Sequence, residues 1–247
     1  MTTFAGVDGC RAGWVVAVLD PGGFAPPTVC SHLAEVVQAT APAALTLVDI
    51  PMGLTDQDHP RERACEREAR RLLGRQRSSI FPVPVRAAVH AGTYAEACMR
   101  NCEATGRKLS RQTWGITPKI AEADWLLRGE PSLQHRLRES HPELCFLALN
   151  GWTPLAATGK KTREGQAERL ALLARYVAGA EGAFTEALAR YPRKAAAPDD
   201  LLDAMVLAVA ARQAFAAGIP TIPAEPETDA LGLKMEIVCP AILPQGS

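Results

Sequence analysis

The chain has 247 residues, of which 47% are hydrophobic, and its 27 lysines and arginines balance 27 aspartates and glutamates. This length allows one large domain, or a core domain with a sizeable insertion. A net charge of zero makes no general case for nucleic-acid binding, so any such case has to rest on local basic patches. The N-terminus lacks the features of a signal peptide, and no stretch approaches the ~20 apolar residues of a membrane-spanning helix. We therefore expect an ordinary globular protein without a membrane segment.

The seven cysteines are scattered along the chain, with no Cys-x-x-Cys pair. The simplest interpretation is reduced thiols in a cytoplasmic protein. Cys98 and Cys102 are four residues apart on an expected helix, but no second pair of matching spacing follows them. A zinc site at these two residues therefore has little support.

Residues 4–19 have the pattern of a β-hairpin, with an apolar strand, a turn containing Gly9 and Gly13, and a second apolar strand. Tight turns of this kind often need a positive φ, which glycine adopts readily. Asp8 ends the first strand at the point where the chain bends. A buried carboxylate is costly unless it is paired or binds a cation, although an aspartate also often caps its own turn. Both interpretations stay open from this stretch alone.

A second acid follows a buried strand. After an expected short strand at 28–31 and a helix at 33–39, residues 45–50 form an apolar strand that carries Asp49 near its end. Pro51 and Gly53 stop this strand directly after the carboxylate. Open α/β sheets place their sites at the C-terminal ends of strands, although a turn-capping aspartate is the simpler interpretation of this stretch by itself.

The middle of the chain is mainly helical. Residues 61–77 predict an arginine-rich helix, whose charges are explained by a solvated face or by phosphate contacts. Residues 94–106 predict a further helix, residues 109–117 a loop, and residues 119–128 a helix opened by Pro118. No Gly/Ser-rich linker flanks this region, so we interpret residues from about 60 to 130 as a helical insertion in one core domain.

Residues 139–149 predict a fifth strand, entered through Pro142 and with Glu143 at its start. The neighbouring His141 is a candidate for proton transfer, although a lone histidine beside a proline is more often structural. A polar loop with Lys160 and Lys161 then leads into a helix at 166–178. A second helix is expected at 183–191.

The most apolar helix of the chain is expected at 198–217, with Asp199 as its N-cap. Asp200 and Asp203 are three residues apart, so they share one face of its first turn. The helix dipole accounts for Asp199 and Asp200 but not for Asp203, which is embedded among apolar residues. The last segment, 231–238, predicts a short edge strand after a proline-rich turn at 220–226.

The acids therefore come from separate core elements, which are the hairpin with Asp8, the strand with Asp49, and the helix with Asp200 and Asp203. If they converge without a cation, their repulsion raises at least one pKa sharply. Mg²⁺ and Mn²⁺ both accept carboxylates together with waters. Two such ions about 4 Å apart stabilise the attacking and leaving oxygens of a phosphodiester. The pattern thus predicts a two-cation site.

The order of these elements resembles the ribonuclease H-like fold, an α/β fold with a mixed sheet and helices on both faces. The run from Gly6 to Gly13 is similar to the first-strand motif of bacterial Holliday-junction resolvases. The run from Asp200 to Ala204 resembles the Asp-x-x-Asp-Ala sequence that opens their last catalytic helix.

A closer resemblance is to domain-of-unknown-function family 429, whose bacterial and archaeal members are predicted ribonuclease H-like nucleases. Its pattern recurs along nearly the whole chain. The motifs are Gly6-Val7-Asp8 with Trp14, Asp49-Ile50-Pro51-Met52-Gly53-Leu54, Arg70 to Gly74 followed by Ser79 and Phe81, Pro118-Lys119-Ile120 with Glu122 and Asp124, His141-Pro142-Glu143 with Phe146, Lys160-Lys161, and Asp199-Asp200 with Asp203-Ala204.

The resemblance implies metal-ligand roles for Asp8, Asp49, Asp200 and Asp203, with Glu143 as a further ligand or general base. The second acid of the resolvases is commonly a glutamate, so the shorter Asp49 is a departure that affects the metal geometry. The basic residues expected to contact phosphate are Arg70, Lys119, Lys160 and Lys161.

These features predict a metal-dependent nuclease or phosphoesterase that hydrolyses a phosphodiester with Mg²⁺ or Mn²⁺. Its expected partner is nucleic acid or another phosphodiester, and a homo-oligomer is left open. One alternative is a kinase or ATPase of the actin-like type, but the sequence shows neither a second phosphate loop nor a late glycine-rich adenosine loop. Another is a non-catalytic nucleic-acid-binding protein on the same fold, since folds do not fix function.

Overall fold

The computed structural model describes residues 2–56, 62–156 and 159–240. The chain divides into two compact units. Unit 1 comprises Met1–Asp49, His135–Pro220 and Val238–Ser247, and unit 2 comprises Ile50–Gln134 and Thr221–Ile237. The predicted α/β class is confirmed. The helical insertion expected at about 60–130 falls within the bounds of unit 2.

Unit 1 is built on a mixed sheet. Its strands lie in the order β3-β2-β1-β5-β6, and β4 also pairs with β2. The hairpin strands β1 and β2 are antiparallel, whereas β1 with β5 and β5 with β6 are parallel. The hairpin expected at 4–19 is therefore confirmed, and its first strand lies in the middle of the sheet. Its turn is at Arg11 and Ala12, so Asp8 and Gly9 lie within β1 and not at the bend. The bounds are β1 Thr3–Cys10, β2 Gly13–Asp20, β3 Gly23–Phe24, β4 Thr28–Cys30, β5 Ala43–Val48 and β6 Leu137–Glu139.

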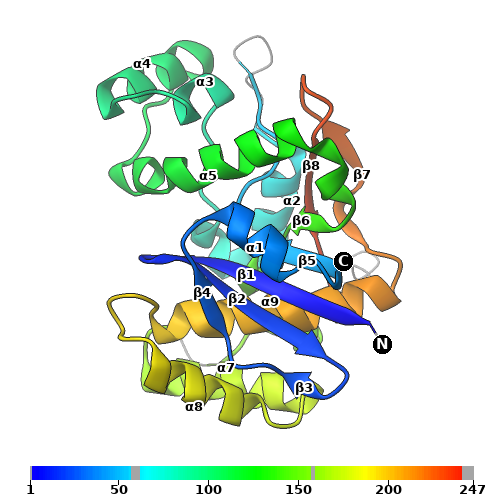
Figure 1. The fold of residues 1–247 in the computed structure, drawn as a ribbon. Coiled ribbons are helices and arrows are strands. Elements are labelled where there is room, and N and C mark those ends of the chain that lie inside the picture. The colour runs from blue at the N-terminus through cyan, green and yellow to red at the C-terminus, as the bar shows by residue number, and fades with distance from the viewer. Residues whose placement is uncertain (1, 57–61, 157–158, 241–247) are drawn as a thin grey trace. The chain divides into compact units, whose positions relative to one another are not determined.

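One face of this sheet is covered by the long helix α9, which Figure 1 shows in orange alongside β1 and β2. The helices α6, α7 and α8 pack against α9, and α1 contacts β2 and β4. Val15, Ala17, Leu45 and Leu47 belong to the apolar core on the α9 side. Val16, Thr46 and Val48 alternate with these residues along the strands, so their side chains point to the opposite face. They are also buried, so both faces of the sheet are covered. The bounds are α1 Leu33–Ala39, α6 Pro142–Leu149, α7 Arg163–Tyr176, α8 Ala180–Arg190 and α9 Pro198–Ala216.

Two predictions in unit 1 are wrong. Residues 139–149 are not a strand, because β6 ends at Glu139 and Pro142 opens the helix α6. Proline suits the first turn of a helix, and a helix that is apolar on every side cannot be told from a buried strand by periodicity. The N-cap of α9 is Ala197, and Asp199 lies inside the first turn.

Unit 2 combines helices with a small sheet in which β7 pairs with β8. The helices predicted within 61–77 and at 94–106 are confirmed by α2 and α4. The bounds are α2 Ala64–Leu73, η1 Gly74–Ser79, α3 Arg86–Val89, α4 Tyr94–Thr105, α5 Arg111–Gly129, η2 Pro131–His135, β7 Thr221–Thr228 and β8 Lys234–Val238.

The loop predicted at 109–117 is instead the start of α5, which contains Pro118. Ser110 caps this helix, because its Oγ accepts a hydrogen bond from Thr113 N at 2.9 Å. Pro118 has no N–H for the Trp114 carbonyl, and the Thr117 hydroxyl donates to that oxygen at 2.8 Å instead. The proline-rich segment expected as a turn at 220–226 belongs largely to strand β7.

Two further observations concern the whole described chain. Within the described ranges, no helix combines the length and the apolar character needed to cross a membrane. All of the cysteines are free thiols, as the scattered spacing predicts.

The approach of α9 to β1 depends on Gly6. A Cβ at this position would lie 2.1 Å from Ala204 O and 2.2 Å from Ala208 N, both of which are backbone atoms of α9. Gly6→Ala is therefore expected to push α9 away from the sheet and to destabilise the protein by about 1–3 kcal/mol. Urea unfolding of the two proteins measures the difference.

Gly182→Ala is the matched control, because nothing lies within 4 Å of a Cβ at this glycine of α8. Alanine in a helix is favoured over glycine by roughly 0.5–1 kcal/mol, so this variant should be as stable as the wild type or more stable. Equal stability of Gly6→Ala and wild type would contradict the close contact.

Candidate functional site

The pairing of β1 with β5 brings Asp8 and Asp49 together. Gly6 is in register with Leu47, and Asp49 N donates a hydrogen bond to Val7 O at 2.9 Å. Side chains alternate along a strand, so Asp8 shares the face of Gly6 and Asp49 shares the face of Leu47. Gly6 contacts α9 and Leu47 lies in the α9-side core. Both carboxylates therefore lie side by side on the face of the sheet that α9 covers.

Helix α9 adds Asp200 and Asp203 from its first two turns. Asp200 caps the helix, because its Oδ2 accepts a hydrogen bond from Ala197 N at 2.8 Å. Asp203 is only 1% exposed, and its buried Oδ1 has no hydrogen-bond partner in the structure. The predicted convergence of acids from the hairpin, the second strand and the last helix is therefore present in unit 1.

Lys160 reaches this cluster from the turn before α7. Its Nζ donates to Asp203 Oδ2 at 2.6 Å, and its side chain is 38% exposed. Burial by itself would lower the pKa of Lys160, but the carboxylates of Asp203, Asp8 and Asp49 raise it above its ordinary value. The ammonium is thus surrounded by acids. The sequence predicts Lys160 as a phosphate contact and gives no sign of its pairing with Asp203.

The acids repel one another, as their convergence predicts. Burial raises the pKa of Asp8 well above its usual range, and the charges of Asp49 and Asp203 raise it further. Burial also raises the pKa of Asp203 to about 7, where the pull of Lys160 opposes the effects of Glu143 and Asp49. For Asp200 burial is again the main cause of a raised pKa. Burial and mutual repulsion therefore both favour the neutral forms of Asp8 and Asp203.

Glu143 lies near the cluster on α6 and is bound by a residue that the sequence analysis missed. Arg169 of α7 is 2% exposed, and its Nη2 donates to Glu143 Oε1 at 2.7 Å and to Oε2 at 3.0 Å. The buried residues Gly165, Arg169 and Leu173 are four apart along α7. This spacing places Arg169 on the inner face of the helix, and it is the signal that could have identified it. His141 precedes α6, and its buried Nδ1 has no partner.

The predicted phosphate-binding residues are divided between the two units. Lys160 and Lys161 lie in unit 1, and Lys161 is close enough to Asp200 to lower its pKa. Arg70 and Lys119 lie in unit 2. Arg70 is engaged there, because it forms ion pairs with Glu62 and Glu66 and donates to Ile80 O at 3.1 Å. A single basic groove that contains all four stays a prediction.

Metal binding can be judged from the donor atoms. Within the described residues, no group of three or more His, Cys, Asp or Glu side chains is arranged so that it could hold a metal ion. The donors themselves are hard carboxylate oxygens, the ligands that Mg²⁺ and Mn²⁺ prefer. Asp203 Oδ1 is buried and has no hydrogen-bond partner, so a cation would not have to displace a hydrogen bond to contact it. The residues fit such an ion in chemistry, but their present arrangement is not a complete ligand set.

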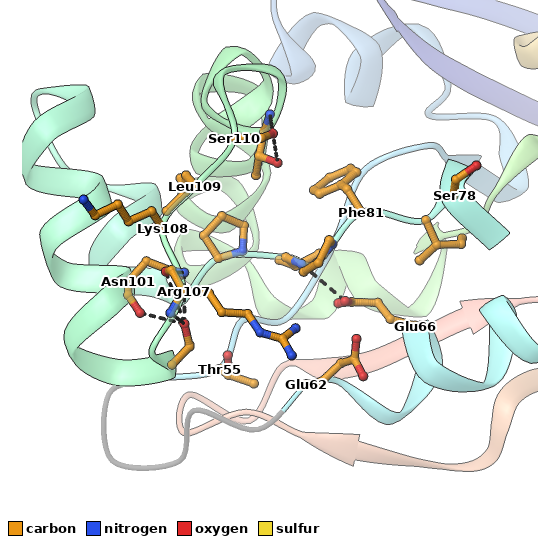
Figure 2. Close-up of a pocket in the computed structure, with 16 residues that line it drawn as sticks. Thr55, Glu62, Glu66, Ser78, Phe81, Asn101, Arg107, Lys108, Leu109 and Ser110 are labelled. Carbon is orange, nitrogen blue, oxygen red and sulfur yellow. Dashed lines mark hydrogen bonds between the residues drawn. The ribbon is translucent and has the colours of Figure 1, made fainter.

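Unit 2 contains a separate cavity of about 640 Å³, shown in Figure 2. Its wall combines Phe81 and the following Pro82-Val83-Pro84 segment with residues that precede α5, among them Arg107 and Lys108. Glu62 and Glu66 also line it, and both form ion pairs with arginines. No acid of the unit 1 cluster belongs to this cavity.

The fold and the site define the class of protein, which is an α/β protein with a partly buried carboxylate cluster beside two parallel strands. The model of a family described as "Protein of unknown function (DUF429)" matches residues 6–228, and the chain belongs to this family. Membership in the predicted family is thus confirmed. Neither the curated proteins nor the solved structures include a match to the chain.

The raised pKa values of Asp8 and Asp203 predict a pH-dependent stability. The pKa of Asp203 is about 7 in the folded protein against 3.8 as the ordinary value. The contribution of such a group is fully present below the ordinary value and is lost as the pH rises through the folded value. We expect the metal-free protein to lose on the order of a few kcal/mol of stability between pH 4 and pH 7 from these carboxyls.

Urea unfolding in EDTA at several pH values measures this effect. Asp203→Asn removes one of the titrating groups, so the stability of the variant should fall less steeply over the same range. Identical pH profiles for the variant and the wild type would contradict the raised pKa of Asp203.

Proposed function

We propose that the protein is a metal-dependent hydrolase of phosphodiester bonds, a nuclease or related phosphoesterase, on a ribonuclease H-like core. The observation that carries the proposal is the convergence of Asp8, Asp49 and Asp203, of which Asp8 and Asp203 are buried and all three repel one another. Such repulsion destabilises a protein unless a cation offsets it. A cluster of this kind is therefore more readily explained by cation binding than by stability.

The order of the elements supports the ribonuclease H-like assignment. An antiparallel hairpin is followed by a parallel strand, and a late helix packs on the central strand of the sheet. Each of these elements carries an acid at the position that the resemblance implies. The likeness rests on topology and on the place of the acids, and function has to be argued from the site.

In this proposal Asp8, Asp49 and Asp203 would hold Mg²⁺ or Mn²⁺, and Asp200 would complete the set with the oxygen that does not cap α9. When bound, such an ion would supply an activated water and stabilise the charge on the phosphate. Arg169 orients Glu143, which keeps this carboxylate near the cluster as a further ligand or a general base. The exposed Lys161 is a contact for the phosphate backbone.

The two alternatives make different demands. An actin-like kinase or ATPase needs a second phosphate loop, whereas residues 159–162 form a lysine-bearing turn that leads into α7. In a non-catalytic nucleic-acid-binding protein, the buried and unpartnered Oδ1 of Asp203 would lower stability without serving binding. Both remain outcomes of the experiments below.

Asp203→Asn tests the metal-dependent reaction. We expect Mn²⁺ to raise the melting temperature of the wild type but not of the variant, because the amide is a poor ligand for the ion. Without metal the variant should be at least as stable as the wild type, since one repelling charge is gone. Mn²⁺-dependent cleavage of labelled DNA and RNA oligonucleotides should fall by more than the ~10–100-fold that loss of an outer metal-site partner costs.

Asp199→Asn is the control, because Asp199 lies one turn before Asp203 in α9 but is not part of the proposed ligand set. It should retain the metal-induced shift and the cleavage. An unchanged wild-type melting temperature with Mn²⁺, together with a large loss of stability in Asp203→Asn, would show that Asp203 is only the structural partner of Lys160.

Salt dependence separates nucleic acid from a small phosphate ester. Contacts of lysines with a phosphate backbone release counterions, so oligonucleotide affinity should fall steeply between 50 and about 200 mM salt. Fluorescence anisotropy with labelled single- and double-stranded oligonucleotides measures it, and Lys161→Ala should reduce the slope by about one. A flat dependence would favour a small phosphate ester as the substrate.

A further inference from the structure

The cavity of unit 2 has the size of a small-molecule site. Its volume of about 640 Å³ lies within the range of roughly 300–1,000 Å³ that is usual for such sites. All of its lining residues fall between Thr55 and Thr113, so the cavity belongs to unit 2 alone. One wall is the segment 80–84 after η1, and another is the segment 107–110 between α4 and α5 (Figure 2).

The first of these walls is apolar and carries an aromatic ring. Phe81 and Pro84 both line the cavity, and the side chain of Phe81 is only partly buried. Among the described residues, no other aromatic ring and no cation stacks on Phe81. Nucleobases stack on aromatic side chains of this kind in many binding sites. The wall therefore suits a planar ring system.

The charges around the cavity leave one guanidinium without a partner. Glu62 and Glu66 line the cavity, but Glu62 forms an ion pair with Arg70, and Glu66 pairs with Arg63 and Arg70. The exposed side chain of Arg107 has no ion pair or hydrogen bond with any other described residue. Figure 2 shows that it extends from the second wall into the cavity. A guanidinium binds phosphate or carboxylate oxygens through two parallel hydrogen bonds, so the ligand should carry an anionic group.

Two hydroxyl groups of the cavity are also available to a ligand. Thr55 and Ser78 line it, and neither side chain takes part in a hydrogen bond within the described ranges. Asn101 differs, because it accepts from Val85 N at 3.1 Å and donates to Arg107 O at 2.8 Å. A hydroxyl group both donates and accepts, which suits the hydroxyl groups of a sugar.

We propose that the cavity of unit 2 binds a nucleotide, with its base on Phe81, its phosphate on Arg107 and its sugar beside Thr55 and Ser78. A nucleotide joins in one ligand the planar ring, the polar linker and the anion that these groups recognise. It is either free in solution or one residue of a single strand. The inference goes beyond the proposed function, because it uses no residue of the carboxylate cluster and needs no metal ion.

Isothermal titration calorimetry of the full chain in EDTA tests the ligand class. AMP and UMP should both bind. Adenosine and inorganic phosphate should each bind at least about tenfold more weakly, since each lacks one of the two anchoring contacts.

Two variants remove the anchors one at a time. Phe81→Ala should weaken the binding of AMP by about fivefold or more, which is the low end of the loss measured for a removed base stack. Arg107→Ala should weaken it by about tenfold or more, to the level at which the wild type binds adenosine. Arg107 is exposed, so its variant keeps the test valid even if Phe81→Ala does not fold. The control is Arg71→Ala, because Arg71 is an exposed arginine of α2 outside the cavity.

A short single-stranded oligonucleotide distinguishes the two sources of the ligand. If the nucleotide belongs to a strand, the oligonucleotide should bind more tightly than AMP, and Arg107→Ala should weaken both by the same factor. If the nucleotide is free, AMP should bind and the oligonucleotide should not compete with it.

Three results would overturn the proposal. The first is the absence of binding by AMP, UMP and the oligonucleotide, and the second is equal affinity for AMP and inorganic phosphate. The third is binding of AMP that neither Phe81→Ala nor Arg107→Ala weakens. None of these results involves the carboxylate cluster, so each would leave the proposed function standing.

Discussion

The contact of α9 with β1 at Gly6 is the constraint on which the rest of unit 1 depends. Because this residue has no side chain, the backbone of α9 lies directly on the central strand. Asp203 is next to Ala204, whose carbonyl makes this contact, and Asp8 is two residues beyond Gly6 on the same face. One steric condition in the core thus sets the position of two acids.

The close approach of these acids to one another lowers the stability of the folded protein. Carboxylates held beside one another in a buried place repel, and burial favours their neutral forms. Two cations from α7 and the turn before it offset part of this charge, with Lys160 on Asp203 and Arg169 on Glu143. In the proposed function a bound cation offsets the repulsion that remains. Under that proposal, stability without metal and affinity for metal are opposed.

The two units divide the chemistry of the chain. Unit 1 holds the acids and the lysines that neighbour them, and unit 2 holds Arg70, Lys119 and a cavity with an aromatic wall. Phosphate binding by the arginine-rich helix stays a prediction. Arg70 is largely engaged with two glutamates and a backbone carbonyl, as charged residues of helices often are.

Local pattern determined much of this protein. Apolar runs that end at turn-forming residues predicted the hairpin, the strand before Asp49 and the helix that carries Asp203, because such runs and chain breaks are properties of neighbouring residues. The same logic failed at 139–149, where a fully buried helix has no polar face. Only the tertiary structure paired Lys160 with Asp203 and Arg169 with Glu143, since these partners are 43 and 26 residues apart. Long-range pairing is decided by how helices pack on the sheet, which no local period records.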